Sequence, residues 1–192
     1  MPYPAQVDRQ SIIAEAHQMI EAEGVEALSL AKLARALGIK APSLYGHLRD
    51  KTELLREVNT LTVQQLSIAV QGAVQAAPPK PHTRFLALAL AYRAFAHANP
   101  RTYMLSTTSA ADELRPPEEI MLGVALPLQA VIAEISGEAN SLPALRGAYG
   151  LVHGFVMLEL TNQLRRGGDL ETAFVQSVEA YLRGWEANRK GD

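Results

Sequence analysis

Glycine and proline divide this sequence into blocks in which apolar residues recur at helical spacing. Few stretches alternate apolar and polar residues with the period of two that is typical of a strand. In the first block, Ile12, Ile13, Ala16 and Ile20 fall on one side of a helix that Gly24 is placed to end. The pattern predicts an all-α chain of about nine helices. We expect these helices at 8–23, 30–37, 41–48, 50–76, 83–98, 101–106, 118–136, 141–166 and 170–188.

The segments between these helices carry their own signals. Residues 78–81, Pro-Pro-Lys-Pro, predict a stiff connector, and Pro127 predicts a kink inside a helix. The polar segment 106–117 is typical of a mobile loop. The string Asp50-Lys51-Thr52-Glu53 predicts a capping box at the start of the longest helix, and Asp169 is placed to cap the last one.

Composition limits the chemistry that the chain can carry out. Its 192 residues are 48% hydrophobic and 20% charged, which is enough apolar material for a packed core. The absence of cysteine excludes disulfides, thiolate metal sites, iron–sulfur clusters and a cysteine nucleophile. No signal peptide is apparent, and the longest uncharged apolar-rich run, 120–133, is too short to span a bilayer. We therefore expect a cytoplasmic protein without a membrane partner.

Residues 29–55 predict a helix-turn-helix unit, in which a short helix, a tight turn and a second short helix follow one another. Ala34 is small enough for the two helices to cross closely. Gly38 lies in the turn, where a positive φ is cheap only for glycine. Pro42 fits the first turn of the second helix, where no hydrogen bond is lost. The face of this helix opposite its leucines carries small or hydrogen-bonding residues: Lys40, Ala41, Ser43, Tyr45, Gly46 and His47.

The charge distribution supports contact with DNA phosphates in this segment. The formal net charge of −2 shows no bias toward a nucleic-acid partner. Residues 27–56, however, hold six basic and two acidic side chains, whereas residues 1–26 hold one basic and five acidic side chains. The positive charge is therefore concentrated in 30 residues, as a phosphate-binding surface requires.

Two strings within this segment closely resemble the TetR/AcrR family of transcriptional regulators. Residues 33–39 read Leu-Ala-Arg-Ala-Leu-Gly-Ile, and residues 44–55 read Leu-Tyr-Gly-His-Leu-Arg-Asp-Lys-Thr-Glu-Leu-Leu. The resemblance covers roughly residues 8–56, a stretch that contains the helix-turn-helix and the start of a long fourth helix. The sequence departs from the family pattern at Lys40, where a serine-type cap is common, and at Gly46, where many members carry a larger side chain.

The resemblance implies roles for individual residues. Three side chains would hold DNA phosphates: Tyr45, His47 and Lys51. Four residues would face base edges in the major groove: Lys40, Ala41, Ser43 and Gly46. It further implies an N-terminal three-helix DNA-binding domain over residues 1–51 and a larger helical ligand-binding and dimerisation domain over 52–192.

Residues 57–192 are more apolar than one small core requires. The additional apolar surface can line a ligand cavity or form a subunit interface. Family members have both, with the last two helices forming a four-helix bundle across a two-fold axis. The 141–166 segment carries a row of small residues, Ala144, Gly147, Gly150 and Gly154, beside which another backbone can pack. Packing within one subunit is the alternative explanation for this row.

Two segments resemble the WHG-type subgroup of TetR ligand domains. They are 91–100, Ala-Tyr-Arg-Ala-Phe-Ala-His-Ala-Asn-Pro, and 149–159, in which Tyr149 replaces the expected tryptophan. Aromatic and methionine side chains can form an adaptable pocket, although they can equally belong to an ordinary core. The candidate ligand-binding residues are Tyr92, Phe95, Tyr103, Met104, Met121, His153 and Met157.

No catalytic motif accompanies these features. The chain has no Gly-x-Ser-x-Gly, His-Glu-x-x-His or phosphate loop, and its histidines do not pair with acids at ligand spacing. We expect no cofactor or metal. We expect a homodimeric regulator, a repressor that a small and largely apolar molecule releases from double-stranded operator DNA. The alternatives are a helical adaptor or an all-helical enzyme in which residues 29–55 do not bind DNA.

Overall fold

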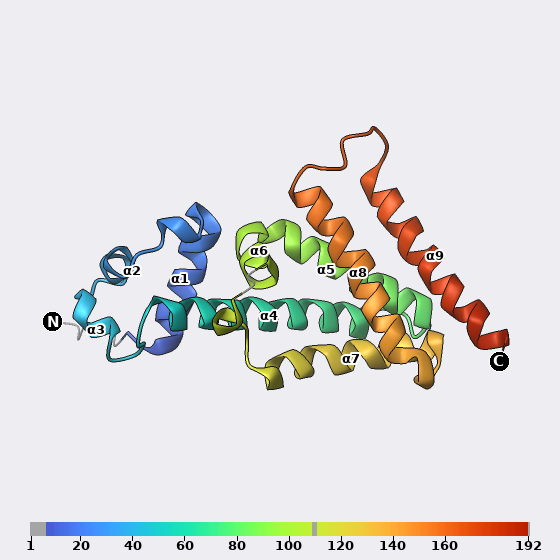
Figure 1. Ribbon diagram of the computed structural model, residues 1–192, viewed down its shortest axis with the longest axis horizontal. Helices are drawn as coiled ribbons and strands as arrows, with labels where there is room; N and C mark the ends of the chain where they lie inside the picture. Colours follow the sequence, from blue (N-terminus) through green and yellow to red (C-terminus); the bar gives the residue numbers. More distant parts are fainter. Residues whose placement is uncertain (1–6, 109–110, 192) are drawn as a thin grey trace. The chain divides into compact units, whose positions relative to one another are not determined.

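The computed structural model describes residues 7–108 and 111–191, with side chains as far as residue 189. This part of the chain contains nine α-helices and three short 3-10 helices, and no strand (Figure 1). The expectation of an all-α chain with about nine helices is confirmed. The helices are α1 (Arg9–Glu23), α2 (Leu30–Ala36), α3 (Ala41–Leu44), α4 (Lys51–Ala76), α5 (Pro81–Ala98), α6 (Pro100–Thr108), α7 (Glu118–Ser136), α8 (Ser141–Leu160) and α9 (Leu170–Gly191).

The chain divides into two compact units. The first lies within residues 1–65 and 99–121, and the second within 66–98 and 122–192. The division falls inside α4, so this single helix begins in one unit and ends in the other. The assignment of DNA binding to residues 1–51 and of ligand binding to 52–192 concerns function and stays a prediction.

The first unit is built around the helix-turn-helix. Asp8 caps α1 by accepting a hydrogen bond from the Ser11 N–H at 2.7 Å. The core of the unit contains Leu33, Ala34 and Leu44 at the crossing of α2 and α3, all at most 2% exposed. Gly38 has a φ of +68° in the turn between these helices, as its position predicted.

Helix α3 is shorter than the predicted 41–48, because its hydrogen bonds change register after Leu44. The N–H groups of Tyr45, Gly46 and His47 donate to carbonyls three residues back, at 3.3, 3.3 and 2.9 Å. This tighter turn replaces the last half of the predicted helix. The residues after Leu44 therefore lie in a turn that leads toward α4.

Helix α8 ends at Leu160 rather than at the predicted Arg166, and Asn162 is the reason. Asn162 adopts a positive φ of 54°, the left-handed conformation that closes many helices. The Gln163 N–H donates to the Leu158 carbonyl at 2.8 Å, and the Asn162 N–H donates to the Glu159 carbonyl at 2.9 Å. Together these bonds form a Schellman motif. The predicted cap of the last helix is confirmed, since Asp169 accepts from the Thr172 N–H at 2.9 Å.

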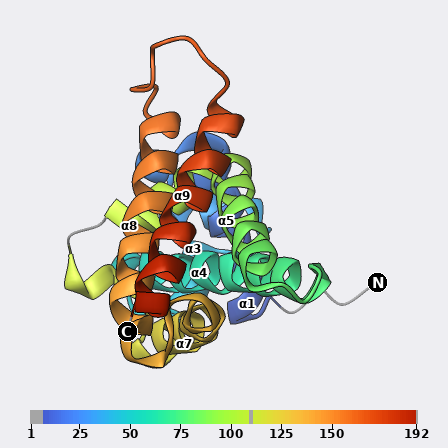
Figure 2. The same cartoon turned by 90° about the vertical axis from the view of Figure 1, so that its right-hand side faces the viewer.

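In the second unit, α5, α8 and α9 pack against one another. Figure 2 shows α8 and α9 side by side. Phe174, Val178 and Leu182 form the buried side of α9, and Val152 and Val156 belong to that of α8. The core of this unit is thus drawn from helices that are separated along the chain.

Gly147 accounts for part of the small-residue row within a single subunit. A Cβ added at Gly147 would lie 2.4 Å from the hydroxyl oxygen of Tyr181. That hydroxyl donates to the Ala144 carbonyl at 2.7 Å, so α9 contacts the backbone of α8 here. Nothing lies within 4 Å of a Cβ built at Gly150 or Gly154, so these two glycines are not explained by packing inside the subunit.

Gly147→Ala is expected to destabilise the protein by about 1–3 kcal/mol, because Tyr181 has to move away from the Ala144 carbonyl. The matched control is Gly72→Ala in α4, where a Cβ meets nothing within 4 Å and alanine favours the helix by roughly 0.5–1 kcal/mol. Urea unfolding of both variants measures the difference. Equal stability changes at the two positions would contradict the contact between α8 and Tyr181.

Helix α7 is apolar and weakly covered. An 18-residue stretch of it has a mean hydropathy of 1.5 and is 22% buried, and by length and composition alone this helix could cross a membrane. Helices of soluble proteins also reach this length and hydropathy. Leu122 and Leu126 are 48% and 58% exposed on it. The expectation that the protein has no membrane partner stays a prediction.

Candidate DNA-binding surface and ligand pocket

The residues predicted to contact DNA lie together in one segment, from the turn before α3 to the start of α4. Leu44 and Leu48 point into the core and fix the segment on the first unit. Tyr45 is 61% exposed. The remaining candidates divide into exposed ones (Lys40, Ser43 and Gly46) and half-buried ones (Ala41, His47 and Lys51). Lys40 occupies the N-cap of α3 without a side-chain hydrogen bond, so the cap that a serine would supply is missing.

The capping box at the start of α4 is present in a modified form. The Glu53 N–H donates to Asp50 at 2.8 Å, as predicted. The Glu53 carboxylate, however, accepts from the Arg49 N–H at 2.7 Å and not from that of Asp50. Because Lys51 is the first residue of α4, its side chain lies at a helix N-terminus, where phosphates are attracted.

Arg9 holds the start of α4 and the turn after α3 together, and sequence reasoning missed it. Its guanidinium donates to Glu53 at 2.7 Å, to Glu57 at 2.9 Å and to the His47 carbonyl. These bonds and those from Arg49 lower the pKa of Glu53 to about 2. The available signal was that Arg9 is the one basic residue among residues 1–26.

The lowered pKa of Glu53 predicts a pH dependence. A carboxylate whose pKa is lower in the folded state stabilises the fold above its unfolded pKa, and this stability disappears as the pH falls through the folded value. The difference in unfolding free energy between the parent and Glu53→Gln should be constant above pH 4.5 and should vanish near pH 2. Urea unfolding across this range measures it, with the exposed Glu26→Gln as control. A difference that does not depend on pH would contradict the Arg9–Glu53 contact.

Helices α1 and α6 of the first unit cap one another. Glu21 accepts hydrogen bonds from the N–H groups of Arg101 and Thr102, at 3.2 and 3.0 Å, at the start of α6. Arg101 donates in return to the carbonyls of Glu21, at 2.8 Å, and of Ala22, near the end of α1. An acid at a helix N-terminus and a base at a helix C-terminus are both favourable. Movement of α6 would therefore act on α1.

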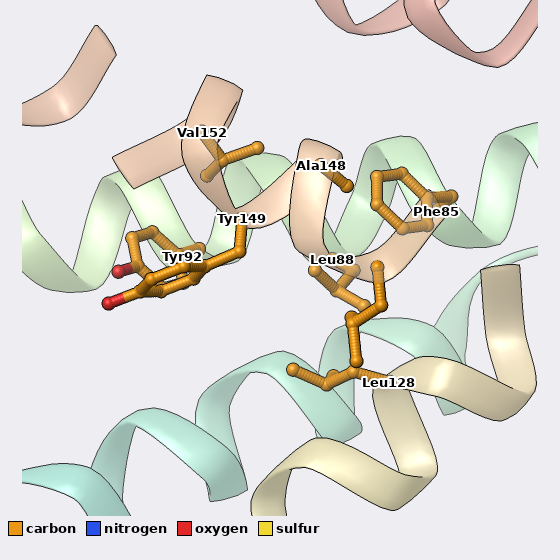
Figure 3. A pocket seen from close by; sticks show the side chains of 8 residues that line it. Phe85, Leu88, Tyr92, Leu128, Ala148, Tyr149 and Val152 are labelled. Carbon is orange, nitrogen blue, oxygen red and sulfur yellow. The ribbon is translucent and has the colours of Figure 1, made fainter. Parts of the chain in front are cut away.

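The second unit contains an apolar pocket of about 350 Å³, a volume that includes the open solvent at its mouth. Three helices line it (Figure 3). Its lining residues are Phe85, Leu88 and Tyr92 from α5, Leu128 from α7, and Leu145, Ala148, Tyr149 and Val152 from α8. In Figure 3 the hydroxyl groups of Tyr92 and Tyr149 lie on the same side of the pocket, and the Phe85 ring lies at the other end.

The seven predicted ligand-binding residues are divided between the two units. Of these seven, Tyr92 alone lines the pocket. Phe95, His153 and Met157 belong to the same unit but lie outside the lining. Three belong to the first unit, where Tyr103 is fully buried: Tyr103, Met104 and Met121. The aliphatic lining was missed because only aromatic and polarizable side chains were selected, although the apolar runs 85–92 and 147–158 contain six of the eight lining residues.

Polar groups of three side chains meet beside the apolar pocket. The Tyr92 hydroxyl lies 3.4 Å from His153 Nδ1, and the His153 ring stacks on Tyr149 with 5.2 Å between centroids. Burial lowers the pKa of His153, which favours the neutral imidazole. Burial also raises the pKa of Tyr149, against the opposing effect of a hydrogen bond with Tyr92. The three side chains therefore form an uncharged hydrogen-bonding group.

A buried ion pair ties α5 to α8 in the same unit. The Glu159 side chain is 3% exposed and accepts two hydrogen bonds from Arg93, at 2.7 and 2.9 Å. His97 lies 3.1 Å from the same carboxylate, and the Arg93 guanidinium lies 5.6 Å from the Phe174 ring centroid. Burial alone would raise the pKa of Glu159, but the hydrogen bonds and charges of Arg93 and His97 together outweigh it and lower the pKa, so the charge of the carboxylate is compensated.

Comparison with known proteins decides the family. The model for bacterial regulatory proteins of the tetR family matches residues 12–58, and the tetracyclin repressor-like C-terminal domain matches residues 85–181. An uncharacterized HTH-type transcriptional regulator of Mycobacterium tuberculosis is 32% identical over 186 residues, which cover 95% of this chain and 84% of the relative. The chain belongs to the TetR family. It is a DNA-binding transcriptional regulator rather than an enzyme.

Solved structures agree with this TetR-family fold. A protein of unknown function from Rhodococcus sp. RHA1 has a TM-score of 0.82 and 25% identity, covering 96% of this chain and 98% of that one. A TetR variant from Acinetobacter baumannii in complex with minocycline has a TM-score of 0.69 and 21% identity, covering 96% and 99%. The latter likeness concerns the fold alone.

Proposed function

We propose that this TetR-family regulator is a repressor that leaves its operator when a small, largely apolar molecule occupies the pocket lined by α5, α7 and α8. The observation that supports ligand binding is the pocket itself, with its eight apolar or aromatic lining residues. The minocycline complex of a regulator with the same fold supports small-molecule binding. The family's operator binding supports the other half of the proposal.

We propose that residues 40–51 form the operator-binding surface. Tyr45 and Lys51, with His47, would contact phosphates and set the register on the duplex. Lys40, Ala41, Ser43 and Gly46 would face base edges in the major groove. The exposure of Tyr45 and the position of Lys51 at the start of α4 support these roles.

The operator-bound form would be a homodimer that pairs through α8 and α9. Exposed small residues support this choice, because they allow helices of two subunits to approach closely. A Cβ at Gly150 of α8 or Gly184 of α9 would meet nothing within 4 Å, and Ala180 of α9 is exposed. Leu142 and Leu158 add apolar surface on α8, at 42% and 38% exposure. The dimer would place two copies of α3 in successive major grooves.

The effect of ligand binding would be transmitted to the DNA-binding surface through the helices that follow one another along the chain. Helix α4 starts at Lys51 in the first unit and ends in the unit that holds the pocket. Helix α5, which contributes Tyr92 to the pocket, leads through Asn99 into α6, and α6 is capped reciprocally with α1 by Glu21 and Arg101. The ligand would act only if it bound the DNA-incompetent state more tightly.

A pocket-filling pair of variants tests the release mechanism. Leu128→Trp fills the pocket, while Leu126→Trp adds the same ring to an exposed position two residues away that is not part of the lining. Fluorescence anisotropy on a duplex selected by the protein from a random pool measures operator affinity with and without ligand. Leu128→Trp should bind the duplex but lose the ligand response, and Leu126→Trp should keep both. An unchanged response in Leu128→Trp, or an operator affinity that saturating ligand leaves unchanged, would refute the proposal.

A further inference from the structure

We infer that Arg9 and Glu53 are positioning residues for operator binding. They hold the turn 47–51 in the shape in which its side chains reach DNA phosphates. This role rests on the proposal that residues 40–51 bind the operator, and it belongs to two residues that lie outside that surface. It follows from the hydrogen bonds that fix the backbone of the turn.

The backbone of the turn is fixed at two points, one on each side of a buried leucine. The Arg9 guanidinium donates to the His47 carbonyl, and the Glu53 carboxylate accepts from the Arg49 N–H at 2.7 Å. Between these points the Leu48 side chain packs in the core at 4% exposure. Residues 47–49 belong to no helix, so these contacts replace the hydrogen bonds that a helix would supply.

Arg9 and Glu53 also bind each other, so the two anchors of the turn form one structure. Arg9 of α1 donates to Glu53 at 2.7 Å and to Glu57, one turn further along α4, at 2.9 Å. The Glu53 side chain is 16% exposed and carries a negative charge. It is therefore unsuited to contact a phosphate itself, and its effect on DNA binding would pass through the turn.

The side chains that the turn carries need a fixed backbone. His47 and Lys51 lie at its two ends, and both are proposed to bind phosphates. Phosphate contacts set the register on the duplex, and binding groups have to be held within about 0.5 Å of their productive positions. A turn without its anchors would have to be ordered at the moment of binding, which costs conformational entropy and lowers the affinity.

Glu53→Gln separates position from charge, because the two predict opposite results. The substitution removes an anion next to the proposed DNA-binding surface and releases the Arg49 guanidinium, whose Nε lies 3.2 Å from the carboxylate. Electrostatics alone therefore predicts tighter binding to DNA. The carboxylate, however, uses one oxygen for Arg9 and the other for the Arg49 N–H, and glutamine has only one acceptor oxygen. We expect operator binding to weaken by about three- to tenfold.

Fluorescence anisotropy on the selected duplex measures this change. Glu26→Gln is the matched control, because it removes an exposed anion from the first unit and should leave the affinity unchanged. Each protein is measured at a temperature where circular dichroism shows it to be folded, so that lost stability is not counted as lost affinity. Binding by Glu53→Gln that equals or exceeds that of the parent would overturn the positioning role.

Arg9→Lys tests the same role without a change in net charge. Lysine lacks the planar fork with which arginine reaches a carbonyl and two carboxylates at once. We expect operator affinity to fall by about tenfold. Arg84→Lys is the control, since Arg84 pairs with Glu134 between α5 and α7 in the second unit, and this variant should keep its affinity. An unchanged affinity in Arg9→Lys would show that the contacts of Arg9 serve stability alone.

A cycle of Arg9→Lys with Lys51→Ala shows whether Arg9 acts through the turn. If Arg9 positions Lys51, the loss caused by Arg9→Lys should be smaller by about threefold or more when Lys51 is already absent. Losses that multiply independently would mean that Arg9 acts on DNA by another route, and they would overturn the role.

The salt dependence of binding by Lys51→Ala distinguishes failure of the positioning role from failure of the proposed surface. If Lys51→Ala has a slope smaller by about one unit while Glu53→Gln binds more tightly than the parent, residues 40–51 bind DNA and the positioning role is wrong. If the slope of Lys51→Ala equals that of the parent, the proposed surface is itself wrong, and the positioning role fails with it.

Discussion

Ala180→Arg is expected to convert the proposed dimer into monomers and to lower the affinity for a two-half-site operator by roughly a hundredfold or more. Ala180 is exposed on α9, the helix that we propose to pair with its copy in a second subunit. An arginine there would place a charge in a closely packed interface without a partner. Each half-site would then have to be bound independently, which removes the advantage of bivalent binding.

Analytical ultracentrifugation gives the oligomeric state of this variant, and anisotropy gives its operator affinity. Ala76→Arg is the matched control, since it introduces the same side chain at an exposed alanine near the end of α4. The control should remain dimeric and keep its affinity. A variant Ala180→Arg that stays dimeric would place the interface elsewhere, and a monomer with unchanged operator affinity would exclude the bivalent arrangement.

Arg93→Met is expected to destabilise the protein by about 3–5 kcal/mol, because it leaves the buried Glu159 carboxylate without its main partner. The deficit should shrink as the pH is lowered. Protonation of Glu159 would remove the uncompensated charge.

The double variant Arg93→Met/Glu159→Gln completes a cycle with the two single variants. It should recover most of the lost stability, because both charges are then absent. Urea unfolding at pH 7 and pH 5 measures all four proteins. A double variant that is as unstable as the sum of the two single variants would show that the ion pair does not hold α5 to α8.

Local signals predicted much of the first unit. A helix-turn-helix was indicated by Gly38, by Pro42 and by the spacing of the buried leucines. Each of these signals depends only on a residue's own backbone or on its nearest neighbours. The end of α8 was predicted wrongly, because Asn162 was not recognised as a left-handed closing residue. The ligand roles of Phe95, Tyr103 and the other candidates stay predictions.

The pocket could not be located from composition. Its lining depends on which sides of α5, α7 and α8 face one another, and residues as far apart as Phe85 and Val152 meet only after folding. The same holds for Arg9, whose carboxylate partners Glu53 and Glu57 lie more than forty residues along the chain. The small residues of α8 show the same limit. Their spacing can be read from the sequence, but the contact of Gly147 with Tyr181 cannot.

The salt dependence of duplex binding by the parent and by Lys51→Ala shows whether residues 40–51 bind DNA. Each phosphate contact contributes about 0.9 to the slope of log affinity against log salt concentration. We expect Lys51→Ala to weaken binding to all duplexes about equally and to reduce the slope by about one unit, whereas the exposed Lys80→Ala leaves both unchanged. Binding by the parent that does not decline with salt, or an unaltered slope in Lys51→Ala, would contradict phosphate binding by residues 40–51.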